Sequence, residues 1–113
     1  MEGALHHGIE LFNSREYFEC HEVLEDAWMS ETGPRKLFLQ SIIHFAVAYY
    51  HLGRDNRVGA IRQMRKAIRK LQPYAPVYEG VDTDALLRNG WATLESVRRG
   101  DPVQYPLIGL CGT

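Results

Sequence analysis

The stretch "EYFECHEVLEDAW", residues 16–28, decides how this chain is expected to fold. Its aromatic and aliphatic residues recur every three or four positions, which is the period of an amphipathic helix. One face of that helix collects the side chains of Tyr17, Phe18, His21, Leu24, Glu25 and Trp28. His21 and Glu25 therefore occupy the centre of the face that should pack against the core, where a charged group needs a partner.

The rest of the chain keeps the same helical period, and no segment keeps the alternation of a strand for long. Asn13 or Ser14 is suited to cap the second helix, and Asp82 or Thr83 to cap the fifth. We expect helices over about residues 3–13, 15–29, 34–52, 56–71 and 83–100. The predicted fold class is all-α: a compact array of about five helices with short loops, an extended C-terminal tail and no sheet.

Length and composition indicate an ordinary globular protein. The 113 residues are 45% hydrophobic and 24% charged, which predicts one helical domain over residues 1–113. In the tail we expect Tyr105, Leu107 and Ile108 to pack back onto the body.

Neither a targeting signal nor a membrane span is visible in the sequence. The first residues lack the basic and apolar regions of a signal peptide, and the longest apolar run, near residues 41–52, is too short for a bilayer. Cys20 and Cys111 lack a C-x-x-C spacing and resemble the free thiols of a reducing compartment. We expect a cytoplasmic protein that does not associate with membranes.

The third predicted helix offers partners for His21 and Glu25. It is apolar nearly all round, which is typical of a central helix, but one stripe is polar and contains Gln40, Ser41, His44 and His51. Because the preceding loop is short, the second and third helices should pack antiparallel. The two polar stripes would then meet in a pocket between these helices.

Two interpretations of such a pocket remain open. His21, Glu25, His51 and His44 would be ligands of a divalent metal such as zinc, with Glu22 as a catalytic base and Tyr17, Trp28 and Gln40 completing the pocket. However, "HEVLE" is not the H-E-x-x-H motif of zinc proteases. The simpler interpretation, which we favour, is a buried hydrogen-bond network in which the polar side chains satisfy one another.

Charge is divided along the chain, although the net charge is only −1. Acidic residues dominate up to Glu31, whereas residues 54–70 are strongly basic. A basic amphipathic helix can contact phosphates, but it can equally be a solvated face or the complement of an acidic surface on the same or another subunit. The balanced total makes nucleic acid an unlikely partner and leaves a homodimer open.

The residues of two segments carry a resemblance to a known family. "LFNSREYFECHEVLEDAW" and "FLQSIIHFAVAYYHLGRDNRVGAIRQMRKAIRKL", together about half of the chain, resemble the domain of unknown function 309 family of small bacterial and archaeal helical proteins. The resemblance implies a compact all-helical fold without an established activity. The positions that match the family pattern are Phe12, Asn13, Tyr17, His21, Glu22, Glu25, Trp28, Gln40, His51, Asn56 and Gly59. Ser41 and His44 depart from it, which weakens His44 as a required ligand.

Three functions of different classes remain open from the sequence. The first is a metal-assisted hydrolase that uses the His/Glu pocket, and the second is a non-catalytic helical interaction or scaffold protein. The third is a nucleic-acid accessory protein that uses the basic helix. The sequence specifies neither a small-molecule ligand nor whether the protein is an enzyme.

Overall fold

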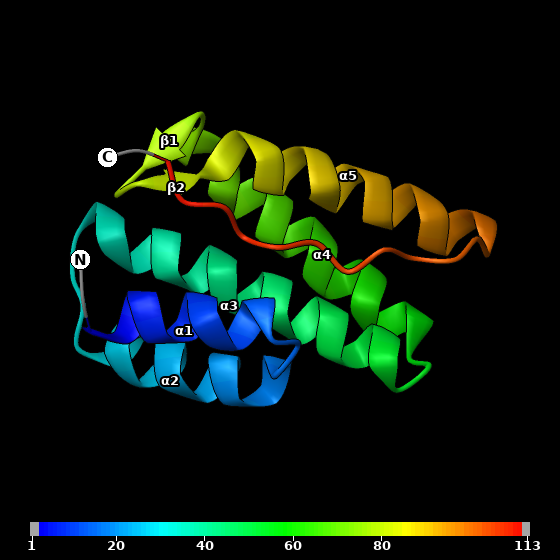
Figure 1. The fold of residues 1–113 in the computed structure, drawn as a ribbon, viewed down its shortest axis with the longest axis horizontal. Coiled ribbons are helices and arrows are strands. Elements are labelled where there is room, and N and C mark those ends of the chain that lie inside the picture. Colours follow the sequence, from blue (N-terminus) through cyan, green and yellow to red (C-terminus); the bar gives the residue numbers. More distant parts are fainter. Residues whose placement is uncertain (1–2, 112–113) are drawn as a thin grey trace.

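The computed structural model describes residues 3–111, and its architecture is all-α, as predicted (Figure 1). In these residues the α-helices are α1 (Gly3–Asn13), α2 (Tyr17–Met29), α3 (Pro34–Gly53), α4 (Arg57–Leu71) and α5 (Thr83–Arg99). A 3-10 turn, η1 (Gln72–Tyr74), and a hairpin of β1 (Val77–Tyr78) and β2 (Val81–Asp82) connect α4 to α5.

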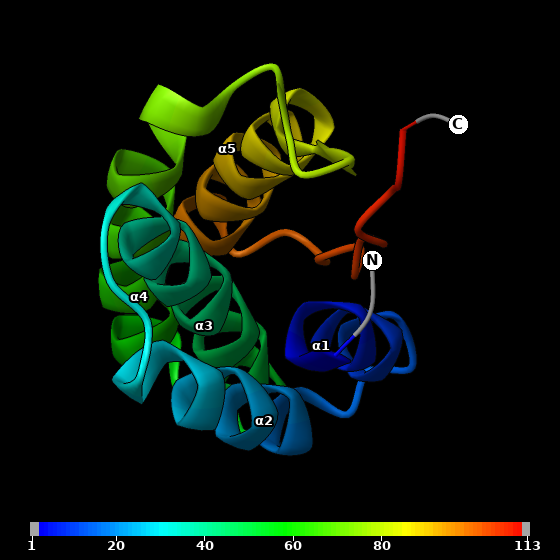
Figure 2. The same cartoon turned by 90° about the vertical axis from the view of Figure 1, so that its left-hand side faces the viewer.

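Helix α3 lies at the centre of the arrangement. Viewed along the molecule, α1 and α2 cover one side of it, and α4 and α5 cover the other (Figure 2). Its buried residues occupy most of its circumference, namely Phe38, Leu39, Ser41, Ile42, Ile43, Phe45, Ala46, Ala48 and Tyr49. The prediction of a central third helix is therefore confirmed, since only a helix packed on several sides can bury so many faces.

The starts of two helices, α4 and α5, follow from local side-chain caps. The side chain of Asn56 accepts a hydrogen bond from the Gly59 amide at the start of α4, and Asp82 accepts one from the Ala85 amide at the start of α5. The expected cap of α2 is wrong. This helix begins two residues later than predicted, at Tyr17, because Arg15 has a left-handed backbone with φ of 61°.

The hairpin corrects the expectation of a chain without strands. Val77 pairs with Asp82 and Tyr78 with Val81 in an antiparallel register. The turn between them is formed by Glu79 and Gly80, which both have positive φ, as the tight turns of two-residue hairpins require. Strands of two residues are too short to show alternation, so the sequence pattern did not reveal them.

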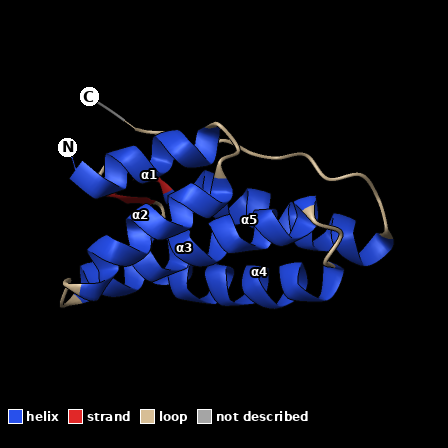
Figure 3. Cartoon of the chain, turned by 90° about the horizontal axis from the view of Figure 1, so that it is seen from below, coloured by secondary structure: helices blue, strands red, loops and turns tan. Residues whose placement is uncertain are grey.

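The C-terminal tail crosses the molecule and returns to α1 (Figures 1 and 3). The side-chain amide of Asn13 donates to the Ile108 carbonyl at 3.1 Å and accepts from the Ile108 amide at 2.7 Å. As expected, Ile108 is buried and Tyr105 packs on the body, but Leu107 is exposed, which corrects the prediction for that residue. Asn13 thus binds the tail instead of capping α2.

In the described residues, no helix combines the length and the apolar character that crossing a bilayer requires.

Candidate functional site

Helices α2 and α3 enclose a small cavity between them. Its volume is about 140 Å³, and its lining residues are Tyr17, Phe18, His21, Val47, Tyr50 and His51. His21 and His51, which the sequence proposed as partners, therefore lie at the same cavity, one on each helix. This cavity differs from the polar pocket expected between the two helices, because aromatic rings form most of its wall and Glu25, His44, Gln40 and Trp28 do not line it.

A larger cavity of about 570 Å³ adjoins the first and shares Tyr17, Phe18 and Tyr50 with it. We call the two cavities together the aromatic groove. The larger part is lined in addition by Arg15, Glu16, Glu19, Tyr49, Gly53, Arg54 and Tyr105. It lies where the start of α2, the end of α3 and the C-terminal tail come together.

Two arginines stack on tyrosine rings at the groove. The guanidinium of Arg15 lies 4.7 Å from the ring centre of Tyr105, and that of Arg54 lies 5.4 Å from the ring centre of Tyr50. Neither forms an ion pair with a carboxylate of the described residues, although Glu16 and Glu19 line the same cavity. A guanidinium held over a ring in this way keeps its N–H donors available at the ring's edge.

Tyr17 contributes a buried polar group without a partner in the described residues. Its ring packs against Phe12, Tyr49 and Tyr105, with ring centres 5.2, 5.7 and 6.1 Å away. The residue is 6% exposed and its hydroxyl forms no hydrogen bond. Burial raises the pKa of Tyr17 to about 12, so the hydroxyl keeps its proton and remains a potential donor.

His21 and Glu25 are neighbours, but they are less buried than expected. The distance between His21 Nε2 and Glu25 Oε1 is 3.4 Å, which confirms that the two side chains are within reach of each other. The Glu25 side chain is 49% exposed and the His21 side chain 26% exposed, so the prediction that both are largely buried is wrong. The reason is geometric: both point to the outer edge of the α2–α3 contact, whereas Cys20 and Leu24 fill the interior. Glu22 is exposed on the same helix.

His51 has a hydrogen-bond arrangement that fixes its tautomer. The side-chain oxygen Oδ1 of Asn56 accepts from the Gly59 backbone amide at 2.9 Å. The side-chain nitrogen Nδ2 of Asn56 therefore faces His51 Nδ1, at 3.3 Å. The Nδ1 atom therefore accepts, and in neutral His51 the proton is on Nε2. A Cβ atom at Gly59 would lie 2.7 Å from the Asn56 amide and 2.9 Å from the His51 ring. Only glycine fits there without displacing this pair.

His44 points away from α2, toward α4. Its Nδ1 lies 2.7 Å from the Gln63 carbonyl oxygen, and its Nε2 lies 3.0 Å from Lys70 Nζ, which also donates to Gln40. Both ring nitrogens are thus engaged, with Nδ1 donating and Nε2 accepting. Burial lowers the pKa of His44, and the nearby cations Lys70, Lys66 and Arg69 lower it further, whereas the hydrogen bond that His44 donates to Gln63 raises it. The ring is therefore held neutral.

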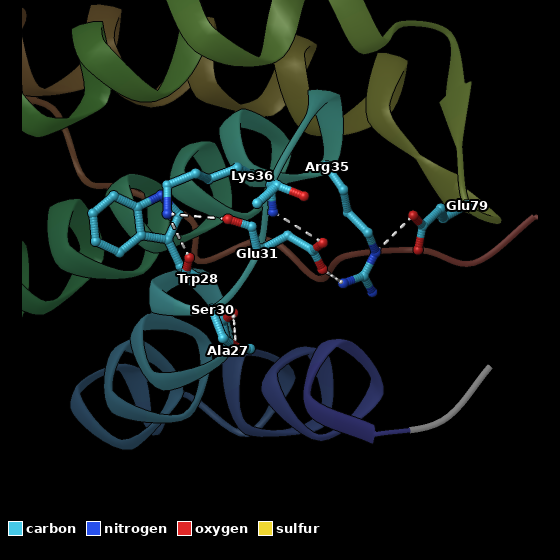
Figure 4. Close-up of polar contacts among 8 residues, drawn as sticks. Ala27, Trp28, Ser30, Glu31, Arg35, Lys36 and Glu79 are labelled. Atoms are coloured by element: carbon cyan, nitrogen blue, oxygen red, sulfur yellow. Dashed lines mark hydrogen bonds and ion pairs between the residues drawn. The ribbon is translucent and has the colours of Figure 1, made fainter.

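Trp28 lies outside the groove, at the loop that joins α2 to α3 (Figure 4). Lys36 Nζ lies 4.2 Å from the centre of its ring and donates to the Trp28 carbonyl at 2.8 Å. Next to it, Arg35 joins Glu31 of the loop to Glu79 of the hairpin turn, at 2.8 and 2.7 Å. These contacts hold the loop between α2 and α3 in place, so Trp28 stabilises the connection of the two helices.

The expected ligand set does not come together at one point. His21 pairs with Glu25, His51 with Asn56, and His44 with Gln63 and Lys70. Among residues 3–111, no group of three or more His, Cys, Asp or Glu side chains is arranged to hold a metal ion. The groove instead contains Arg15, Arg54 and Tyr105, which the sequence reasoning did not select. Only the tertiary contact of the tail with α2 and α3 brings them together.

Comparison with known proteins places these residues in a family. A family model described as "Domain of unknown function (DUF309)" matches residues 5–63, more than half of the chain. The matched segment contains every groove residue except Tyr105. "Uncharacterized protein YpuF" of Bacillus subtilis (strain 168) is 33% identical over 105 residues, which cover 88% of this chain and 60% of YpuF. This chain thus spans less than two thirds of the length of that relative. The chain belongs to the DUF309 family, as the resemblance in its sequence implied.

Proposed function

We propose that this protein is a small-molecule-binding protein whose aromatic groove binds a planar organic anion. The observation that supports this most directly is the pairing of two guanidinium groups with tyrosine rings around a cavity of about 570 Å³. Cavities of this size, with apolar walls and a few polar groups, are typical of ligand sites.

The polar groups of the groove favour an anionic ligand. Arg15 and Arg54 are donors only, and the protonated Tyr17 hydroxyl has a proton to donate and no described acceptor. A carboxylate or a phosphate monoester would accept from such donors, and hydrogen bonds to charged groups are the stronger ones. The ring walls would hold the planar part of the same molecule.

The carboxylates in the lining limit the charge of that ligand. The negative charges of Glu16 and Glu19 balance the positive charges of the two arginines, so the groove has no large excess of positive charge. A polyphosphate would meet repulsion from both glutamates, whereas a single anionic group next to the arginines would not. We therefore propose a ligand with one anionic group.

Metal-assisted hydrolysis is the second candidate, supported by the contact of His21 with Glu25 and by the presence of His51 at the same small cavity. It would require His51 to approach the His21–Glu25 pair and Glu22 to turn toward them as a base. Elemental analysis of the purified protein separates the two candidates. Stoichiometric zinc that His21→Gln removes, with the fold retained, would favour hydrolysis over simple binding.

We also propose that the protein works in a reducing compartment such as the cytoplasm. Cys20 and Cys111 are free thiols, one buried and one exposed. An exposed free thiol is common where disulfides do not persist. Fractionation of cells that express the full-length protein tests this location.

Binding itself is tested with a panel of aromatic carboxylates and aryl phosphates, monitored by ligand-detected NMR and followed by calorimetry. We expect at least one binder, and Arg54→Leu should weaken it about tenfold or more because one charged hydrogen bond is lost. Arg65→Leu is the matched control, since it removes the same charge from an exposed position on α4.

Equal affinity in Arg54→Leu, Arg65→Leu and the unmodified protein would show that the binder does not use the groove. If no member of the panel binds, the proposed ligand class is wrong.

A further inference from the structure

A second surface, formed by α2, α3 and α4, has opposite charges on its two sides. We call it the three-helix face. Its side chains recur every three or four positions on each helix, so each set lies on one side of its helix. They are Phe18, Glu22, Glu25 and Met29 of α2, Leu37, Gln40, His44 and Val47 of α3, and Arg62, Lys66 and Arg69 of α4. The acidic residues are on α2 and the basic ones on α4.

Contacts with α3 show that the two outer stripes face the same side of the molecule. His21 of α2 shares a cavity with Val47, and Gln63 of α4 bonds to His44. Lys66 and Arg69 lie near enough to His44 to lower the pKa of its ring. Helix α3 lies between α2 and α4 when the molecule is viewed end-on (Figure 2).

Most charged groups of this face lack partners on the described part of the chain; the exception is Glu25, whose Oε1 lies 3.4 Å from His21 Nε2. Arg62, Lys66 and Arg69 form no ion pair with a described carboxylate, and Glu22 forms none with a described cation. Apolar side chains of the same face also reach solvent: on α2, Phe18 is 46% exposed and Met29 67%, and on α3, Leu37 is 40% exposed. Exposed apolar side chains next to charged groups that lack partners are typical of a surface that binds another protein.

We infer that the three-helix face binds a second copy of this chain, forming a dimer with its two-fold axis parallel to α3. Rotation about that axis places α2 of one copy over α4 of the other, and the reverse contact follows by symmetry. Glu22 and Glu25 of each copy then meet Arg62 and Lys66 of its partner. Because the acidic residues are on α2 and the basic residues on α4, this axis brings opposite charges together at both contacts.

The charges also select this axis against the other two-fold arrangement. If the axis ran across α3 within the same plane, α2 would lie on α2 and α4 on α4. Acidic residues would then face acidic residues, and basic would face basic, which disfavours that dimer. Helices α2 and α4 both run antiparallel to α3. A two-fold axis parallel to α3 keeps each residue at the same position along that direction, so each residue of α2 meets the residue of the partner's α4 that lies at the same level along α3.

Charge reversal tests the dimer, with mass measured by analytical ultracentrifugation in low-salt buffer at micromolar protein. One variant carries Glu22→Lys with Glu25→Lys, and the other carries Arg62→Glu with Lys66→Glu. Each places like charges at both contacts of its own homodimer. We expect the unmodified protein to be dimeric and each variant to dissociate about tenfold more readily or more. All four positions differ from the residues used to test the groove.

Mixing the two variants provides the decisive measurement. In the mixed dimer, reversed α2 faces reversed α4 at one contact, and two unmodified helices meet at the other, so both contacts are complementary again. Recovery of a dimer on mixing, together with weaker dimerisation at high salt, supports the inference. A monomeric unmodified protein, or variants that dimerise as well alone as when mixed, would overturn it. Circular dichroism melting of each variant excludes unfolding as the cause. This outcome does not depend on ligand binding in the groove.

Discussion

The two sides of α3 use histidine in different ways. On the α4 side, both nitrogens of His44 are engaged by Gln63 and Lys70. On the α2 side, His51 has one nitrogen bound to Asn56, and His21 is close to a half-exposed glutamate beside a cavity. The first side is a closed packing contact, whereas the second leaves polar groups and space. A polar residue in a helical stripe therefore indicates a site only when its neighbours leave one of its hydrogen-bonding groups unoccupied.

The largest effect is expected when the Asn56–His51 pair on the α2 side of α3 is disturbed. Gly59→Ala would bring a methyl group to 2.7 Å from the Asn56 amide, so we expect α4 to lose its cap and the fold to lose about 2 kcal/mol. Chemical denaturation measures the change. Gly53→Ala is the matched control, because a Cβ there has no atom within 4 Å among its surroundings. Equal stability of the two variants would show that the Gly59 contact is not restrictive.

Tyr17 and Tyr49, whose rings stack on each other, differ in whether their hydroxyl groups are satisfied. The Tyr17 hydroxyl has no partner among residues 3–111, whereas the Tyr49 hydroxyl lies 2.8 Å from that of Thr93. We expect Tyr17→Phe to stabilise the unliganded protein by about 1 kcal/mol and Tyr49→Phe to destabilise it by about 1 kcal/mol. The midpoint of urea unfolding measures both. A loss of stability in Tyr17→Phe would mean that its hydroxyl is satisfied in solution, contrary to the groove as described.

The smallest effect is expected from pH. The pKa of His44 is below its ordinary value of 6.5 in the folded state, chiefly because of burial. Between the folded and unfolded pKa values, the unfolded chain binds more protons, so stability rises with pH there. The contribution of His44 is complete above pH 6.5 and is lost as the pH falls below it. His44→Gln should therefore lose less stability on acidification than the unmodified protein.

Denaturation curves at a series of pH values provide this measurement. His7→Gln, which removes an exposed histidine on α1, is the control and should retain the loss at acidic pH. A steeper acid dependence in His44→Gln than in the unmodified protein would contradict a neutral, hydrogen-bonded His44.

Much of the fold was predictable because its signals are local. The hydrophobic period and the capping residues Asn56 and Asp82 act within one or two turns, so the five helices were assigned correctly from them. The hairpin was missed because Glu79 takes a left-handed backbone that its side chain does not favour. Asn13 was misassigned because its partner, Ile108, is 95 residues away.

The candidate site shows the same division. The sequence by itself determined that α2 and α3 would face each other with aromatic and histidine residues between them, since the 3.6-residue period fixes which side chains share a face. It did not determine that His44 would turn to α4, that Glu25 would reach solvent, or that Tyr105 would return over Tyr17. Those outcomes depend on how helices cross and where the tail lies, and such long-range packing decides which polar groups of a stripe are satisfied and which remain free to bind.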